Sequence, residues 1–243
     1  MKQIEKMGKS FGVLLLACLI ATVFLLSACG GDNDSNSNIN IESNAGDLPV
    51  FKGGDTWTQR GPINGTECTI VFTVTGEDTV NGRGTYAVEG SVEPLISGVV
   101  NRITMKLDKE TLFQLEMRMY NVDTGSQFNA VVNYSYEMSG DPYYPMKVGN
   151  VSTFVSHETT VVVANGETQS SDEVNTYIYK VKKVENVTVP AGTFTCFKIV
   201  RYDETNTVLD TSWESAAVKH FNVKTLYNET KEIQELIAYS VSP

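Results

Sequence analysis

The residues of this chain that could do covalent chemistry are few: 243 residues include four cysteines and two histidines. Cys29 has the most unusual setting, because it stands where a 16-residue apolar run, Phe11–Leu26, gives way to a polar string. A membrane-spanning helix needs about 20 apolar residues, so this run is short for one. A basic start, an apolar middle and an exit of small residues are together typical of a secretory signal; the basic residues are Lys2, Lys6 and Lys9.

The four residues at the end of this signal, Leu26-Ser27-Ala28-Cys29, match the lipobox of bacterial lipoproteins. In proteins with this motif the cysteine thiol is diacylated, the signal is cut just before it, and the new amino terminus is acylated too. The motif needs cysteine because its thiolate is the effective nucleophile near neutral pH. We therefore predict that residues 1–28 are a signal peptide and that Cys29 carries palmitate-type chains that hold the protein at a membrane.

The residue after the cysteine bears on location. It is Gly30 rather than Asp, and by analogy with other lipoproteins this favours the outer membrane over retention at the inner one. We predict a lipid-anchored protein of the cell envelope, in the outer membrane and facing the periplasm or the cell surface.

The segment behind Cys29 is low in apolar residues and rich in Gly, Asn, Ser and Asp. Such a composition cannot bury enough surface to offset its chain entropy. We predict that residues 29–47 are the lipidated cysteine and a disordered linker reaching roughly 25 Å. Residues 48–243 then form the extracytoplasmic domain, with two halves at 48–140 and 141–243.

The charge of the mature chain excludes one class of partner. Loss of the first 28 residues removes three Lys and one Glu and leaves 16 basic and 28 acidic residues, a net charge of −12. Nucleic acid would be repelled by such a field. The charges are spread along the chain, which is typical of a solvated surface.

Two cysteines, Cys68 and Cys196, fall within the predicted domain. Outside the inner membrane the environment is oxidising, so the two thiols can persist as a disulfide. We predict that bond, which would close a loop of about 130 residues. The alternative is two separate buried thiols that behave as small apolar side chains.

Patterns for catalysis or metal binding are absent from the sequence. His157 and His220 belong to no His-Glu-x-x-His pattern, and no Gly-x-Ser-x-Gly elbow occurs. Both histidines are expected to be exposed or satisfied by a backbone group. We predict no enzyme activity, no catalytic residues, no metal site and no cofactor.

The domain is predicted to be all-β with few helices. Many short β-branched and aromatic runs are separated by turn signals such as Asn81-Gly82 and Asn165-Gly166. The run 113–119 shows a period of two, which marks a sheet with one buried face. In it Phe113, Leu115, Met117 and Met119 are predicted to face one way and Gln114, Glu116 and Arg118 the other. The expected architecture is an antiparallel, curved, half-barrel-like sheet.

A weak internal echo supports the two halves. "VTGEDTVNGRGTYAV" (74–88) is similar to "VKKVENVTVPAGTFTC" (181–196), and "PVFKGGDTWT" (49–58) is similar to "PMKVGNVSTF" (145–154). One interpretation is a duplicated β-half within one continuous sheet, and the other is two tandem β-sandwiches. Independent hairpins could also share this turn chemistry.

The segments "VTVPAGTFTCFKIV" (187–200), "SWESAAVKHFNVK" (212–224), "ELIAYSV" (235–241) and "GGDTWT" (53–58) carry a family resemblance. With them the chain resembles the TapB-like family of uncharacterised bacterial lipoproteins. A Gly usually follows the Trp strand in that family, whereas Ala216 and Ala217 stand here. The family is similar in style to half-barrel carriers that hold lipid on a curved sheet. The resemblance implies non-catalytic binding.

Aromatic residues give the remaining functional clue. Trp57 and Trp213 are interpreted as core anchors, whereas Tyr143 and Tyr144, on the link between the two halves, are candidate ligand-binding residues. We predict a membrane-anchored lipoprotein that binds an apolar ligand or lipid. The alternative is a structural lipoprotein that contacts other envelope proteins.

Overall fold

A computed structural model describes residues 45–243 apart from residues 64, 95–100, 121–127 and 165. The predicted signal peptide, Cys29 and most of the predicted linker lie outside the described residues. The described part contains no helix with the length and apolar character needed to cross a membrane. Its elements are β1 (Thr56–Ile63), β2 (Thr66–Val80), β3 (Arg83–Glu93), β4 (Arg102–Asp108), β5 (Gln114–Tyr120), β6 (Phe128–Gly140), β7 (Val151–Ala164), β8 (Glu167–Val189), β9 (Gly192–Tyr202), β10 (Val208–Glu214), the 3₁₀ turn η1 (Ala216–Val218), β11 (Asn222–Tyr227) and β12 (Ile233–Ser240).

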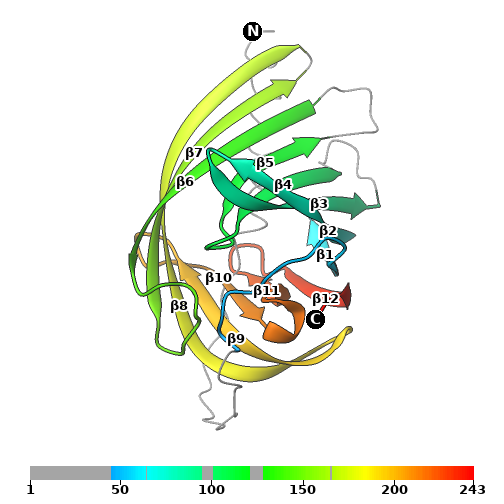
Figure 1. The fold of residues 1–243 in the computed structure, drawn as a ribbon, viewed down its shortest axis with the longest axis vertical. Coiled ribbons are helices and arrows are strands. Elements are labelled where there is room, and N and C mark those ends of the chain that lie inside the picture. The colour runs from blue at the N-terminus through cyan, green and yellow to red at the C-terminus, as the bar shows by residue number, and fades with distance from the viewer. Residues whose placement is uncertain (1–44, 64, 95–100, 121–127, 165) are drawn as a thin grey trace.

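The strands form one closed antiparallel barrel (Figure 1). Each strand pairs with its neighbours in sequence, and β1 pairs with β12, from Thr56 opposite Ser240 to Arg60 opposite Glu235. The predicted all-β, antiparallel, curved sheet with few helices is confirmed. The sheet continues past a half-barrel until its two ends meet, so the interpretation as two tandem sandwiches is wrong.

Alternating side chains fill much of the barrel interior. On β2 the buried residues are Cys68, Ile70, Phe72 and Val74, two apart, as the pleat of a strand requires. Trp57 of β1 is fully buried and donates from its indole nitrogen to the carbonyl of Val218 at 2.9 Å, which confirms it as a core anchor.

The two echoing halves share backbone details. Before β1, the amide of Gly54 donates to the carbonyl of Val74; before β7, the amide of Gly149 donates in the same way to Val181, both at 2.8 Å. Both glycines have positive φ, 94° and 97°, and a β-bulge follows each carbonyl partner, between Val74 and Gly76 on β2 and between Val181 and Lys183 on β8. The bulges lie six strands apart around the sheet, which is the placement that a duplicated half predicts.

The predicted disulfide is not formed. Cys68 on β2 and Cys196 on β9 are both buried free thiols. Their strands are separated around the barrel by β1, β12, β11 and β10, so the two thiols are held on different parts of the wall. The Cys68 thiol contacts the carbonyl of Thr66 at 3.3 Å, and the Cys196 thiol contacts that of Phe194 at 3.6 Å. The alternative of two separate buried thiols describes the structure.

The folded part begins before residue 48. Gly46 is buried, and its carbonyl accepts a hydrogen bond of 2.6 Å from the amide of Met146 in the β6–β7 loop. A Cβ at Gly46 would lie 2.1 Å from the Met146 carbonyl oxygen, so the contact needs glycine. Ala45 and Gly46, predicted to be linker, are therefore packed against the barrel, whereas Asp47 is exposed.

Asp55 connects three separate parts of the chain. Its side chain is 1% exposed and accepts hydrogen bonds from the Lys52 amide at 2.7 Å, the Lys219 ammonium at 2.8 Å and the Ser242 amide at 2.7 Å. Burial would raise the pKa of Asp55, but these hydrogen bonds outweigh it and hold the pKa below its usual value. The carboxylate thus fastens the segment before β1, the β10–β11 loop and the C-terminus together.

Replacing Asp55 with alanine should lower the free energy of unfolding by about 3 kcal/mol, because the largely buried Lys219 ammonium loses its partner. The contribution of Asp55 exists above the ordinary carboxyl pKa of about 4 and is lost as the pH falls through the lower pKa of the folded state. Urea unfolding at neutral and acidic pH measures both effects. Asp78→Asn, in the exposed pair with Lys106, is the control and should leave the midpoint unchanged. A parental midpoint for Asp55→Ala would contradict this role.

Candidate functional site

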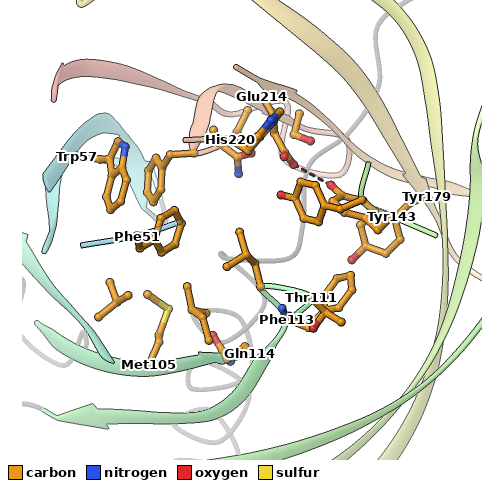
Figure 2. Close-up of a pocket in the computed structure, with 18 of the residues that line it drawn as sticks. Phe51, Trp57, Met105, Thr111, Phe113, Gln114, Tyr143, Tyr179, Glu214 and His220 are labelled. Carbon is orange, nitrogen blue, oxygen red and sulfur yellow. Dashed lines mark hydrogen bonds between the residues drawn. The ribbon is translucent and has the colours of Figure 1, made fainter. Parts of the chain in front are cut away.

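The barrel contains a partly open cavity of about 170 Å³ between its two halves (Figure 2). Two aromatic groups form much of its wall. Trp57 and Phe221 stack with ring centroids 4.6 Å apart, and Phe51 packs on Trp57 at 5.2 Å. On the other side, Tyr143 packs edge-on against Phe113 at 5.6 Å and Tyr179 at 5.5 Å.

The β4–β5 loop brings Gln114 into the cavity. The Asp108 carboxylate, 1% exposed, accepts hydrogen bonds from the amides of Glu110 and Thr111 and is paired with Arg83. This cap lets the chain turn back through Leu112, whose φ is 59°. The turn is therefore stabilised by the hydrogen bonds of the Asp108 carboxylate, and Leu112 near its end has a left-handed backbone conformation.

The predicted orientation of Gln114 is wrong. Alternation assigned it to the face of Glu116 and Arg118, yet it is 3% exposed and lines the cavity. The reason is a bulge: Lys106 pairs with Glu116 and Leu107 with Gln114, so one residue is skipped. A bulge re-aims the side chain beside it, and here it turns an amide inward. Neither atom of that amide has a hydrogen-bond partner among the described residues.

The β10–β11 loop brings His220 to the opposite side of the cavity. Ser215 caps η1, and its hydroxyl also donates to the carbonyl of Thr195 at 2.8 Å. Lys219 and His220 follow with φ of 56° and 55°, a conformation that costs non-glycine residues on the order of 1 kcal/mol or more each. The loop keeps this conformation because the Trp57 indole donates to the carbonyl of Val218 and the Asp55 carboxylate accepts from the Lys219 ammonium.

His220 departs from the expectation for a lone histidine. It is 7% exposed, and neither ring nitrogen makes a hydrogen bond of ordinary geometry within the described part of the chain. Burial lowers the pKa of His220 to about 4, against smaller opposing effects of the Ala45 backbone and Asp47, so the ring is neutral at pH 7. His157, in contrast, is about half exposed beside Glu137, as expected.

The predicted ligand-binding residues Tyr143 and Tyr144 both line the cavity. Tyr143 donates from its hydroxyl to the Glu214 carboxyl at 2.8 Å (Figure 2). Burial raises the pKa of Glu214 to about 8, although the hydroxyls of Tyr143 and Tyr144 oppose the shift. The carboxyl is therefore mostly protonated at neutral pH.

The other carboxylate in the lining is Asp210. It pairs with the guanidinium of Arg201, whose Nε and Nη2 both lie 2.6 Å from one carboxylate oxygen. Burial opposes the charge on Arg201, but Asp210 and nearby tyrosines raise its pKa, so the guanidinium stays charged. Among the described residues, no group of three or more His, Cys, Asp or Glu is placed to hold a metal ion.

The two inward-facing loops occupy equivalent places in the two halves. The loop that leads into Gln114, the first residue of β5, follows the fourth strand of the first half, and the loop that carries His220 follows the fourth strand of the second. The cavity between them is a site of the kind that forms where two structural units meet.

Comparison with known proteins assigns this chain to a family. A family model described as DUF3108-like matches residues 100–233, from the segment before β4 to the start of β12. The chain belongs to the DUF3108-like family. The matched part of this DUF3108-like protein includes both inward-facing loops, whereas Phe51 and Trp57 precede it.

Two crystal structures show a distant likeness to the DUF3108-like chain. One is a predicted lipoprotein from Parabacteroides distasonis, with a TM-score of 0.41, 15% identity and coverage of 80% of this chain and 99% of the other. The second is a predicted exported protein with a YmcC-like fold from Bacteroides fragilis, with a TM-score of 0.38, 13% identity and coverage of 79% and 98%. A comparison with curated proteins found no match.

The sequence indicated the tyrosines of this site but not Gln114 or His220. A glutamine in an alternating strand has the pattern of a surface residue, and a lone histidine has no pattern at all. The bulge that turns Gln114 inward depends on the pairing of β4 with β5, which no short-range sequence signal specifies.

Glu214 should make the stability of the protein depend on pH. Because its pKa in the folded state, about 8, exceeds the unfolded value near 4.3, folding binds a proton between these limits. Stability should therefore fall as the pH rises through this range, by up to about 1.4 kcal/mol per pH unit.

Glu214→Gln should remove this slope and gain stability relative to the parent from about pH 5 to about pH 8, as urea unfolding at several pH values would measure. Glu235→Gln on β12, in a partly exposed pair with Lys224, should keep the parental slope. Parallel stability curves for the parent and Glu214→Gln would show that the carboxyl is ionised throughout.

Proposed function

We propose that this chain is a non-catalytic binding lipoprotein of the bacterial cell envelope, and that it holds a small, largely apolar ligand in the barrel cavity. The observation that carries the proposal is the aromatic cavity, into which the buried amide of Gln114 is aimed without a partner among the described residues. Ligand sites are typically apolar hollows with a few convergent polar groups.

The volume of the cavity narrows the choice of ligand. An engineered apolar cavity of roughly 150 Å³ accepts benzene. At about 170 Å³, this one suits a ring-sized molecule rather than a long acyl chain. Of the apolar ligand and the lipid that the sequence left open, we favour the first.

The setting of the protein rests on its N-terminus. The lipobox at Leu26–Cys29 supports acylation and an envelope location, and Gly30 favours the outer membrane. The narrower resemblance to TapB-like lipoproteins is part of the same proposal. The absence of a catalytic pattern in the sequence supports binding without chemistry.

Lipid anchoring predicts that labelled palmitate is incorporated through one cysteine. Cys29→Ser should abolish the label and release the protein from the membrane fraction, because two or more acyl chains are needed for stable anchoring. Cys18→Ser, within the apolar run, is the matched control and should keep both. Unchanged labelling of Cys29→Ser would contradict the anchor.

Ligand binding predicts a saturable site for a ring-sized probe. Fluorobenzene, followed by fluorine NMR, should bind the intact chain in phosphatidylcholine nanodiscs. Ser212→Phe should abolish that binding, because Ser212 lines the cavity on β10 and a phenyl group would fill most of the space.

Thr104→Phe is the matched control, because Thr104 lies on the outer face of β4 between the buried Ile103 and Met105. This variant should bind like the parent. Equal signals from the parent and Ser212→Phe would mean that the probe only partitions into lipid, and a structural or partner-contacting role would then be favoured.

A further inference from the structure

We infer that the ligand is uncharged and carries an amide-like edge, an N–H beside a C=O, which Gln114 binds across the cavity from His220. This inference rests on the proposed function and names the chemical class of its ligand.

Gln114 supplies the first part of the argument. Gln114 is 3% exposed and lines the cavity. Neither the nitrogen nor the oxygen of its side-chain amide has a hydrogen-bond partner among the described residues. A primary amide presents a donor and an acceptor side by side. Its complement is a group with an acceptor beside a donor, such as the edge of a lactam.

His220 supplies the second part. Figure 2 shows it on the far side of the cavity from Gln114. Its neutral ring offers one donor and one acceptor, and its edge contact with Tyr144, at 5.6 Å between centroids, fixes the ring plane.

The backbone supports a role for both residues. His220 itself has a left-handed backbone conformation, and Gln114 lies two residues after Leu112, which has one too. Strained residues of this kind persist where the surroundings over-determine them, and they cluster at ligand sites. Here Asp108 and Asp55 hold the two loops in place.

The lining leaves no charge for an ionic ligand. Asp210 is paired with Arg201, and Glu214 accepts the hydroxyl of Tyr143. Among the described lining residues there is no Lys or Arg. An anion entering the cavity would lose its hydration without meeting a cationic side chain, and a cation would meet only carboxyl groups that already have protein partners, so a desolvation cost opposes either ion. An uncharged polar ring avoids this cost.

A matched pair of probes tests the inference. Fluorobenzene and 5-fluoro-2-pyridone have similar ring sizes, but only the pyridone carries the amide-like edge. With the intact chain in phosphatidylcholine nanodiscs, fluorine NMR should show the pyridone binding about tenfold or more tightly than fluorobenzene. Gln114→Met should remove that preference and leave fluorobenzene affinity within about twofold, which also shows that the cavity is intact.

Two further variants keep the test decisive. Gln114→Leu should likewise remove the preference for the pyridone without reducing fluorobenzene binding, and it provides the answer if Gln114→Met does not fold. Gln169→Met, on the exposed part of β8, should match the parent.

The outcomes separate this inference from the proposed function. Fluorobenzene binding with no preference for the pyridone, or equal loss of both probes in Gln114→Met, would overturn the inference alone. Binding of neither probe to the parent would overturn the proposed function.

Discussion

The pairing of β1 with β12 is the constraint on which the rest of the structure depends. It joins the two ends of a meander in which all consecutive strands pair with one another, so the described sheet has no unpaired edge. The closure is tight. A Cβ at Gly61 of β1 would lie 2.4 Å from the carbonyl oxygen of Ile233, so the two strands could not approach as they do with a larger residue there.

A closed barrel of this size creates a second problem, because side chains alone fill the interior of an eight-stranded barrel but not of a wider one. In this protein, loops and the segment before β1 occupy the additional space. The β4–β5 and β10–β11 loops turn inward, and Phe51 packs against Trp57. What they leave is a partly open aromatic cavity.

The polar groups of the cavity differ in how they are satisfied. Arg201 and Asp210 form a buried ion pair, although Nη1 of Arg201 has no partner among the described residues, and Glu214 accepts the Tyr143 hydroxyl. The amide of Gln114 has no partner in the described part of the chain, and His220 meets the Ala45 backbone without a hydrogen bond of ordinary geometry. A buried polar group left unpaired costs about 1–3 kcal/mol, so their retention at equivalent places in the two halves fits a role in binding.

The sequence by itself determined the fold class and the strand-rich composition, because period-two patterns and turn residues are local properties of the chain. It also indicated Tyr143 and Tyr144, whose aromatic character does not depend on context. Only the tertiary structure decided the closure, the separation of Cys68 from Cys196 and the inward turn of Gln114. Each of these depends on which strands pair and in which register, and such long-range pairing is set by the whole barrel rather than by any one segment.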